Sequence, residues 1–495
     1  MIASNNILTE NRRTQWSEAF ADLLGPDDWV IHSRARQEAA TATFPSAGQI
    51  KGIAYPRSVE ALRGCILLCN RYQLAFHVVS SGKNWGYGSA SSLRDVSVLL
   101  HLQQLNRILD YQPELGVVTL EPGVRFSELR QFLLEQSAPW LIDAPGSTTE
   151  ASVVGHTLER GFAQSQQCER HRSIIDLEVL LPNGKTIYSG MQAFAKCKVA
   201  GLHDAPIGPD FSSLFLQSNL GIVTKMTLQL QRRPRFQQQL FFCGSSTDPG
   251  ENLHNLTNCL RELKTTEILG SSASLYNRAR LLSTLENWPG KLGQQNWYGT
   301  SSLHSEHMPL LQAKRSVAQE AFAKYNLQLK VGALNQPNPH YGWSAPHNLK
   351  LAYGNRPMPQ NPNPDLDQCG LIWVAPVLPF TGNAIQEASN IATEVLQQYQ
   401  LEAKFSIHQL NARVAYLITP VIYDRSVAGA DDNAMNCARQ LTQQLCAAGY
   451  YPYRLSAATA AQVPPPSVSN RQWLQRIKSL TDPHHLFTNG RYDWT

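Results

Sequence analysis

A short glycine-rich segment constrains this chain more than any other feature of its sequence. Residues 81–88 read Ser-Gly-Lys-Asn-Trp-Gly-Tyr-Gly and follow an apolar run at 75–79 that is typical of a β-strand. Glycine tolerates positive φ and lets a bulky anionic group approach the backbone, so such a loop can direct several N–H groups at a pyrophosphate. The spacing G-x-x-x-G-x-G matches neither the Walker loop nor the Rossmann fingerprint. A lone glycine-rich loop is more often an ordinary turn, so its meaning depends on the rest of the chain.

Four other segments, in a fixed order, give the loop its meaning. They are Val117–Val124 (VVTLEPGV), Ser152–Gly161 (SVVGHTLERG), Leu214–Lys225 (LFLQSNLGIVTK) and Asp482–Arg491 (DPHHLFTNGR). Together with the loop, they resemble the vanillyl-alcohol oxidase and p-cresol methylhydroxylase family of flavoproteins. The resemblance is dense over residues 50–230 and 450–495 and loose between them.

The resemblance implies both a cofactor and a fold. The cofactor is FAD, and the fold class is α+β, with a discontinuous two-lobed FAD-binding domain and an inserted α+β cap domain. The alternating strand pattern ends at Arg232-Arg233-Pro234. We therefore predict an FAD-binding domain at 1–232, a substrate cap domain at 233–450 and a C-terminal segment, 451–495, that returns to the FAD-binding domain.

Composition excludes several other classes of protein. A chain of 495 residues suggests two or more domains, and its net charge of +5 comes without a Lys/Arg block, so nucleic acid is not implied. No apolar run is long enough for a membrane span, and no signal peptide is evident at the N-terminus. The nine cysteines are scattered, which suits a reducing cytoplasm, and we expect Cys65 and Cys69 to be buried on a helix rather than to bind a metal.

Local patterns predict the main elements. Helices are expected at 58–72, 126–135, 384–399 and 434–448, and a hairpin is expected at 177–188 around the Pro-Asn-Gly turn. Residues 244–251 form a cluster typical of a loop. The stretch 335–364 is rich in Pro and Asn and predicts either a lid or a disordered segment, with disorder favoured at its tip.

The resemblance also implies a catalytic group. Relatives carry a tyrosine in the glycine loop and a Tyr-Arg pair near the C-terminus, which correspond to Tyr87, Tyr453 and Arg454. Together these side chains bind a phenolate oxygen in the family. Holding a phenol ionised at pH 7 requires about 4 kcal/mol, and charge-assisted hydrogen bonds of about 1.5–3 kcal/mol each can supply it. A benzylic hydride then leaves for the flavin, and the product is a quinone methide.

Several positions depart from the family pattern. Relatives that hydroxylate para-alkylphenols have an acidic residue, thought to be the active-site base, where this chain has Gly146. Glu150 could substitute or could be solvated, and Asp143 is expected to be structural. The chemistry after hydride transfer, whether water addition, desaturation or another reaction, is therefore left open by the sequence.

The flavin linkage departs as well. Many relatives attach FAD through a His or Tyr of the cap domain, but the corresponding segment, Cys369–Pro376, contains neither. In other flavin families a loop His occupies the place of Asn84. Cys369 is expected to be buried and inert, so the prediction is noncovalent FAD. Relatives also have Asn at the place of His156 and Asp-His at the place of residues 169–170.

The resemblance places the FAD pyrophosphate over the glycine loop, the ring near 147–156, and the adenine side against 221–223, with Arg491 near the edge of the isoalloxazine. The residues predicted to bind the cofactor are Ser81, Gly82, Lys83, Asn84, Trp85, Gly86, Gly88, Ser147, Thr148, Gly155, His156, Glu159, Gly221, Ile222, Val223 and Arg491. No cluster with metal-ligand spacing is visible, so no metal site is predicted.

The sequence therefore predicts an FAD-dependent oxidoreductase that takes a hydride from a small organic substrate, with a para-substituted phenol as the first choice. A biosynthetic oxidase or desaturase is an alternative, in which the Tyr-Arg pair grips a carboxylate or carbonyl of the substrate. A non-catalytic electron-transfer subunit is another. The expected partners are a small-molecule substrate and either oxygen or an electron-accepting protein, and relatives often form dimers, which allows a homodimer.

Overall fold

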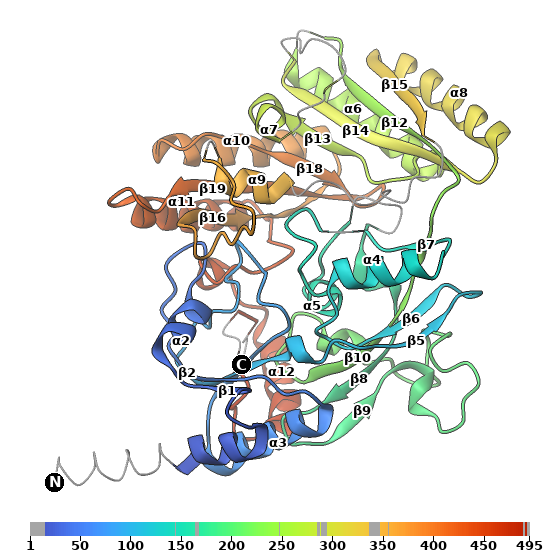
Figure 1. Cartoon of the computed structure of the whole chain (residues 1–495). Helices are drawn as coiled ribbons and strands as arrows, with labels where there is room; N and C mark the ends of the chain where they lie inside the picture. The colour runs from blue at the N-terminus through green and yellow to red at the C-terminus, as the bar shows by residue number, and fades with distance from the viewer. Residues whose placement is uncertain are drawn as a thin grey trace.

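The computed structural model of this protein describes residues 15–143, 145–163, 168–246, 248–284, 288, 295–335, 347–354, 356–488 and 491–492. Within these ranges the strands form four sheets, and Figure 1 shows the largest sheet in the upper half of the molecule and the others below it. Strands between residues 29 and 232 build the three smaller sheets, and strands between 236 and 424 build the large one. The domain limits at 232 and 450 remain our prediction.

The first sheet positions the glycine-rich loop. Its strand order is β1 (Trp29–Val30), β2 (Ile50–Ala54), β4 (Val96–His101), β3 (Phe76–Val79), and both β2 and β3 run parallel to β4. Parallel strands end at one edge of a sheet, where ligands of α/β folds usually bind, and the loop leaves β3 at that edge. The helices α2 (Ser33–Ala40) and α3 (Val59–Tyr72) accompany the sheet, as do the helical residues 15–24. The expected helix at 58–72 is confirmed, since Ser58 caps α3 by accepting a hydrogen bond from the Ala61 N–H.

The second sheet is antiparallel and adjoins the first. Its order is β5 (Ile108–Gln112), β6 (Val117–Leu120), β10 (Ile222–Gln229), β8 (Ile174–Leu180), β9 (Thr186–Tyr188). The β8–β9 pair is the predicted hairpin. A small third sheet pairs β7 (Trp140–Leu141) with β11 (Gln231–Arg232). Two helices belong to this region, α4 (Phe126–Glu135), as predicted, and the short α5 (Val153–Leu158), which Ser152 caps.

The fourth and largest sheet lies above the other three in Figure 1. Its order is β15 (Leu327–Asn335), β12 (Phe236–Gly244), β14 (Trp297–Ser305), β13 (Ser274–Asn277), β18 (Ser406–Gln409), β19 (Val414–Asp424), β16 (Cys369–Val374), and β17 (Val377–Pro379) also pairs with β19. The helices α6 (Pro249–Thr265), α8 (Met308–Lys324), α10 (Gly382–Gln398) and α11 (Ala430–Ala447) supply side chains to the same hydrophobic core as this sheet. The helices expected at 384–399 and 434–448 are α10 and α11. Shorter or later helices are α7 (Arg278–Thr284), α9 (His347–Tyr353) and α12 (Val468–Thr481).

Two expectations about the middle region need correction or completion. The loop expected at 244–251 is shorter, because Pro249 begins α6 and the Asp248 side chain accepts a hydrogen bond from the Gly250 N–H. Proline is favoured in the first turn of a helix, so a residue taken as a loop signal is here a helix start. In the stretch 335–364, residues 336–346 and 355 lie outside the described residues, and α9 occupies 347–353.

The C-terminal segment returns to the first sheet. Phe76 of β3 forms a parallel bridge with Phe487, and their rings stack with centroids 5.1 Å apart. The side-chain amide of Asn219 donates to the Phe487 carbonyl at 3.2 Å. The segment therefore joins β3 to the start of β10, beneath the glycine-rich loop.

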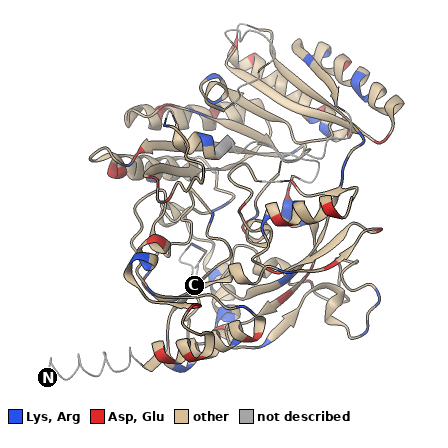
Figure 2. Ribbon diagram, viewed as in Figure 1, with Lys and Arg blue, Asp and Glu red and all other residues tan. Residues whose placement is uncertain are grey.

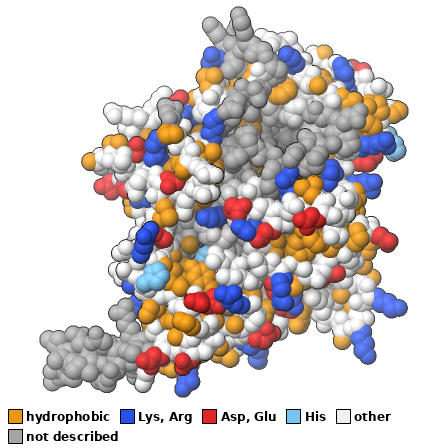
Figure 3. Space-filling view, in the orientation of Figure 1, with side chains coloured by type: hydrophobic (Ala, Val, Ile, Leu, Met, Phe, Trp, Pro, Cys, Tyr) orange, Lys and Arg blue, Asp and Glu red, His pale blue; other side chains and the backbone are white. Residues whose placement is uncertain are grey.

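On the face seen in Figures 2 and 3, the described residues show no concentration of one charge. Figures 2 and 3 show acidic and basic side chains mixed over the visible face. Among the described residues, no helix has both the length and the apolar character required to cross a membrane. Cys65 and Cys69 are both fully buried on α3, as the sequence predicts.

Candidate active site

A cavity of about 540 Å³ lies between the lower sheets and the large sheet. Its lower wall consists of the end of β3 with part of the glycine-rich loop, Asp143, and some residues of the segments 145–159, around α5, and 217–223, at the start of β10. Its upper wall is the inner face of the large sheet, and Tyr453, Arg454 and Arg491 come from the C-terminal part of the chain. The cavity therefore collects residues from across the chain.

The first half of the glycine-rich loop exposes backbone donors to the cavity. Gly82 has a φ of +66°, which favours glycine. Within the described part of the chain, no acceptor takes a hydrogen bond from the N–H groups of Gly82, Lys83 or Asn84. These three residues line the cavity. Adjacent unpaired N–H groups form a concavity that suits a phosphate.

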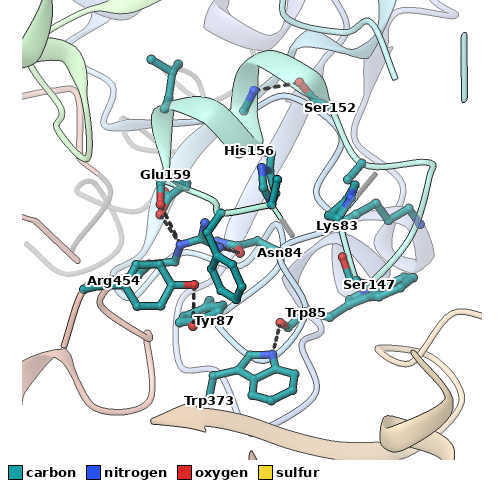
Figure 4. A pocket seen from close by; sticks show the side chains of 18 of the residues that line it. Lys83, Asn84, Trp85, Tyr87, Ser147, Ser152, His156, Glu159, Trp373 and Arg454 are labelled. Carbon is teal, nitrogen blue, oxygen red and sulfur yellow. Dashed lines mark hydrogen bonds and ion pairs between the residues drawn. The ribbon is translucent and has the colours of Figure 1, made fainter. Parts of the chain in front are cut away.

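The second half of the loop packs against other parts of the protein instead. The Gly86 carbonyl accepts hydrogen bonds from the Trp373 N–H at 3.1 Å and from the Ser456 hydroxyl at 3.2 Å. The Trp373 indole in turn donates to the Trp85 carbonyl at 3.1 Å, as Figure 4 shows. The loop is thus fixed between β16 of the large sheet and the C-terminal segment.

Replacing Gly86 by alanine is expected to lower both the melting temperature and the FAD content. Its φ is +78°, and a Cβ atom there would lie 2.3 Å from Cδ1 of Trp373. Gly429 has the same φ, but a Cβ atom there would meet nothing within 4 Å, so Gly429→Ala is a matched control. We expect the control to lose about 1 kcal/mol of stability and Gly86→Ala to lose about 1–3 kcal/mol more. Thermal melting and the ratio of flavin to protein absorbance measure both effects, and equal behaviour of the two variants would contradict this account.

His156 is held as a neutral hydrogen-bond donor. Its Nδ1 accepts a hydrogen bond from Nε of Arg170 at 3.2 Å, and an arginine is always a donor. The proton of the neutral ring therefore sits on Nε2. Burial, followed by the charges of Arg170 and Arg454, lowers the pKa of His156 well below its usual value. Two positions at which the chain departs from the family pattern, 156 and 170, are thus in direct contact.

Glu159 ties the C-terminal segment to the site. Its carboxylate accepts hydrogen bonds from Nη2 of Arg491 at 2.7 Å and from the Tyr492 hydroxyl at 2.8 Å. Its backbone carbonyl accepts a hydrogen bond from Nε of Arg454 at 2.8 Å. Glu159 therefore positions residues from the far end of the chain, in addition to lining the cavity itself.

Tyr87, Tyr453 and Arg454 form one cluster, which we call the tyrosine–arginine clamp. The two hydroxyls lie 3.3 Å apart, and the Arg454 guanidinium lies 4.9 Å from the centre of the Tyr87 ring (Figure 4). Burial raises the pKa of Tyr87 well above its usual value, so this hydroxyl keeps its proton. Burial alone would lower the pKa of Arg454, but the combined effect of Tyr453, Tyr87, Glu159 and Tyr492 outweighs burial and raises it. The cluster therefore places a guanidinium cation beside two tyrosine hydroxyls.

Most predicted site residues line this cavity. They are Ser81, Gly82, Lys83, Asn84, Trp85, Tyr87, Ser147, Gly155, His156, Glu159, Gly221, Ile222, Val223, Tyr453, Arg454 and Arg491. Three others do not line it. Gly86 and Gly88 pack the loop against Trp373 and Ala457, and Thr148 accepts a hydrogen bond from the Glu150 N–H. Gly86, Gly88 and Thr148 therefore shape their loops and do not face the cavity.

The structure places the two acidic residues nearest to Gly146 in the sequence, Glu150 and Asp143, in different surroundings. Glu150 forms an ion pair with Arg125 at 2.5 Å, and both side chains are 44% exposed. Glu150 does not line the cavity. Asp143 lines the cavity but is buried beside Arg170, whose pKa it raises against the effect of burial. Arg170 also donates to the Asp143 carbonyl at 2.7 Å. Asp143 therefore balances a buried arginine, which agrees with the structural role expected for it.

The cavity lining includes two buried side-chain hydrogen-bond donors that are available to a ligand. Within the described residues, Nδ2 of Asn84 and Nη2 of Arg454 are buried and have no hydrogen-bond partner. Buried polar groups are rarely left unpaired in native proteins. Together with the free N–H groups of the loop, they fit a large anionic cofactor such as FAD. Cys369 lies outside the cavity lining, and Nη2 of Arg356 contacts its sulfur at 3.0 Å.

Comparisons with known proteins agree with this arrangement. The profile of the FAD binding domain matches residues 50–190. The chain is 31% identical to 1'-carboxy-chondrochloren decarboxylase of Chondromyces crocatus, over 96% of each protein. It is 23% identical to the 4-cresol dehydrogenase [hydroxylating] flavoprotein subunit of Pseudomonas putida, over 98% of this chain and 96% of that one. The crystal structure of p-cresol methylhydroxylase with substrate bound superposes with a TM-score of 0.82, at 22% identity and 97% coverage of both chains.

The chain belongs to the vanillyl-alcohol oxidase and p-cresol methylhydroxylase family of FAD-dependent oxidoreductases. The resemblance inferred from five sequence segments and the α+β fold class are thereby confirmed. FAD as the cofactor is supported as well.

The residues of the upper wall of the cavity were not predicted from the sequence. It includes Tyr276, Arg280 and His408, together with many serines of the large sheet, and the Phe162 ring contacts that of His408 from the segment after α5. Serine-rich stretches such as 271–274 are typical of loops, and no motif marks them as part of a site. Alternation along β13 and β18 is the only signal that could have assigned them to one face of a sheet.

Buried histidines make stability depend on pH. Burial lowers the pKa of His77 and His101 to about 4 and that of His304 to about 3, whereas an unfolded chain protonates them near pH 6.5. Stability is therefore complete above pH 6.5 and falls as the pH drops toward 4, by about 1.4 kcal/mol per pH unit for each histidine. Asp365 acts in the opposite direction between pH 7 and 4, because burial raises its pKa to about 7.

The expected result is a melting temperature that is highest near pH 7 and falls steadily to pH 4.5. His101→Gln should make that slope shallower, whereas His203→Gln, at an exposed histidine, should leave it unchanged. A melting temperature that stays constant between pH 7 and 5 would contradict the assignment of these histidines as neutral.

Proposed function

We propose that this protein is a biosynthetic FAD-dependent oxidoreductase that removes a hydride from the benzylic carbon of a para-hydroxyphenyl carboxylic acid and releases CO₂. The observation that carries the proposal is the tyrosine–arginine clamp, with its buried guanidinium and two adjacent hydroxyls. The relative at 31% identity is named a decarboxylase, which supports the second half of the reaction.

The clamp suits a single anionic oxygen atom. Nε of Arg454 donates to the Glu159 carbonyl, and Nη1 donates to Oδ1 of Asn84 at 3.1 Å. A carboxylate that bound side-on would need Nε and Nη2 together, but Nε is already occupied. Nη2 and the Tyr453 hydroxyl are the donors that remain, and the Tyr87 hydroxyl, which donates to Tyr453 in this structure, would have to turn to add a third. A phenolate oxygen can accept all three. The occupied Nε therefore disfavours a carboxylate bound side-on, and the remaining donors suit a phenolate oxygen.

Binding the phenol as its anion prepares the substrate. The free-energy requirement at pH 7 is about 4 kcal/mol, and two or three charge-assisted hydrogen bonds of about 1.5–3 kcal/mol meet it. The negative charge raises electron density at the para carbon and weakens the benzylic C–H bond toward hydride loss. When bound, FAD supplies the acceptor for that hydride. The clamp holds the ring in place while the substrate becomes a neutral quinone methide.

Loss of CO₂ completes the reaction without a base. The bond between the carboxyl carbon and the carbon next to the benzylic position breaks, and its electron pair forms the new C=C bond. The electrons of the quinone methide return to the phenolate oxygen, where the clamp receives the negative charge. Water addition would need a proton acceptor, and Gly146 stands where relatives that hydroxylate have an acid. Glu150 is engaged with Arg125, so it does not replace that acid.

The linkage of FAD is proposed to be noncovalent. Burial raises the pKa of Cys369 to about 11, so its thiolate is scarce at neutral pH. It also lies outside the cavity lining. Flavin that is released into the supernatant on acid precipitation would support this assignment, and flavin retained in the pellet would contradict it.

The first test is the anaerobic reaction with 3-(4-hydroxyphenyl)propanoate that carries ¹³C in its carboxyl group. We expect the flavin absorbance to bleach, with one labelled CO₂ and one 4-vinylphenol formed per flavin. 4-Ethylphenol should bleach the flavin without CO₂, and the O-methyl ether of the acid should do neither. Bleaching by the acid without CO₂ would overturn decarboxylation.

The same experiment separates the alternatives. In the second candidate function, the clamp grips a carboxylate or carbonyl of an alcohol substrate, and then the O-methyl ether should react as well as the phenol. A protein whose flavin no substrate of either kind reduces would indicate an electron-transfer subunit. Repeating the reaction in air, with oxygen uptake as the readout, distinguishes oxygen from an electron-accepting protein as the oxidant.

A further inference from the structure

The inner face of the large sheet is polar, although its other face belongs to the hydrophobic core. Along β12, Leu240 and Phe242 are part of that core, whereas Gln237 and Gln239 line the cavity. Side chains of a strand alternate between its two faces, so residues 237 and 239 share the face that borders the cavity. A polar side chain on the wall of a cavity costs free energy unless it meets hydrogen-bonding partners.

The side-chain amides of Gln237 and Gln239 are available to a ligand. Both residues are only partly buried, and within the described part of the chain neither side-chain amide takes part in a hydrogen bond. Each amide carries two N–H donors and one carbonyl acceptor. A strand rises about 3.4 Å per residue, so the two positions are about 7 Å apart and one small group can contact both amides.

The neighbouring strand places uncharged groups beside the two amides. In the register of β12 with β14, Gln239 lies opposite Ser302 and Gln237 lies opposite His304. The Ser302 hydroxyl lies 2.7 Å from Nε2 of His304 and 2.9 Å from the Ser271 hydroxyl. Burial lowers the pKa of His304 to about 3, so its ring is neutral at physiological pH. The two amides therefore belong to a neutral, hydrogen-bonding part of the wall.

The strands that form this wall favour an uncharged ligand group. Among the described residues, the cavity-lining positions of β12, β13, β14 and β18 hold only glutamine, serine, threonine, tyrosine and histidine. A charged ligand group would lose its hydration here without a counter-charge from these strands. An amide or a hydroxyl can exchange its hydrogen bonds with water for equivalent bonds to the two glutamines, so it loses little on entering.

A row of cavity-lining residues connects the clamp to β12. The Phe162 ring lies 6.1 Å from the Tyr453 ring and 5.0 Å from the His408 ring, so β18 adjoins the clamp. His408 lies opposite Ser274 of β13, and Ser274 lies opposite Thr300 of β14, which pairs with β12. Neighbouring strands are about 4.8 Å apart, so β12 is about 14 Å from β18. A ligand that contacts both the clamp and β12 must therefore be long.

We propose that Gln237 and Gln239, with Ser302 beside them, form a subsite that binds a neutral hydrogen-bonding group, an amide or a hydroxyl, at the far end of an elongated phenolic substrate. The inference rests on the proposed function, because the clamp fixes the phenol at the other end. It changes the expected substrate from a small phenolic acid to a longer molecule with an uncharged polar tail. This tail is separate from the carboxylate proposed to leave, which lies within two bonds of the benzylic carbon.

Binding to the FAD-loaded enzyme tests the subsite. The probes are 4-alkoxyphenols of increasing chain length whose chains end in a primary amide, an alcohol, an isopropyl group or a carboxylate. An ether oxygen replaces their benzylic carbon, so they form no quinone methide. We expect the dissociation constant of the amide or the alcohol to pass through a minimum at one length, at which it binds at least about tenfold more tightly than the isopropyl compound. The better of the two identifies the terminal group.

Variants then locate the effect. Gln237→Met and Gln239→Met should each weaken the preference for the polar terminus over isopropyl, and the double variant should remove it. Gln312→Met is the matched control, because Gln312 is exposed on α8 and does not line the cavity, and it should keep the whole preference. For the wild-type enzyme, isopropyl compounds that bind as tightly as the amide and the alcohol at every length would overturn the inference. Tightest binding of the carboxylate would overturn it too, and neither comparison needs a variant to fold.

Phenolate absorption in the ultraviolet separates this inference from the proposed function. Preferred binding of the amide or the alcohol without a phenolate band would keep the glutamine subsite and contradict the role of the clamp. A phenolate band for every probe, with no preference for a polar terminus, would keep the clamp and contradict the subsite.

Discussion

Arg454→Met is expected to slow anaerobic flavin reduction by a phenolic acid about 10³-fold while the protein keeps its FAD. The clamp must supply about 4 kcal/mol to ionise a phenol at pH 7, which corresponds to a factor of about 10³ in rate. Arg454 is its only cation and is buried, so its charge acts in surroundings of low polarity. Without it, bound phenols should stay protonated, and the phenolate absorption band should be lost. Stopped-flow bleaching and the ultraviolet difference spectrum measure both effects.

Two comparisons isolate the charge of Arg454 from its structural contacts. Tyr453→Phe removes one neutral donor and should slow the reaction by only about 10–10²-fold. Arg413→Met, an arginine of the upper part that does not line the cavity, should leave the rate unchanged. Because Arg454 also bonds to Glu159 and Asn84, melting temperature and FAD content are measured for each variant. A fully loaded Arg454→Met enzyme that reacts at the normal rate would contradict the phenolate role.

Features encoded by neighbouring residues were predictable from the sequence. The N-cap of α3 at Ser58, the helix 126–135 and the hairpin around residues 182–184 all follow from patterns within one element. The glycine-rich loop is also a local signal, since its backbone conformation depends on residues 82–88 themselves. The resemblance to the family predicted which residues form the site, and most of those residues line one cavity.

Features that depend on distant contacts could not be predicted. Gly86 must be glycine because Trp373, 287 positions later in the chain, packs against it, and no pattern near either residue reveals the other. The same holds for the contact of His156 with Arg170, in which a buried guanidinium decides the tautomer of a ring. The polar face of the large sheet was missed for a related reason. Its serines become site residues only when β13, β14 and β18 are aligned side by side.

Lys478→Met is expected to destabilise the protein by about 3–5 kcal/mol, because it leaves a buried carboxylate without its counter-charge. Nζ of Lys478 lies 2.8 Å from Oδ2 of Asp482, and both side chains are almost completely buried. The ammonium also donates to the carbonyls of Asn219 and Phe487, each at 2.8 Å. One lysine thus joins α12 to the start of β10 and to the C-terminal segment.

The loss should reach the cofactor site, because Phe487 lines the cavity and its segment pairs with β3 directly before the glycine-rich loop. Thermal melting and FAD content are the measurements, and Arg476→Met, an exposed position on the same helix, is the matched control. Asp482→Asn should destabilise the protein as well, because it leaves the lysine charge unpaired and weakens acceptance from the N–H groups of Leu486 and Phe487. If Lys478→Met melts at the same temperature as the control, the pair does not hold the C-terminal segment, and the floor of the cavity must depend on the Phe76–Phe487 contact instead.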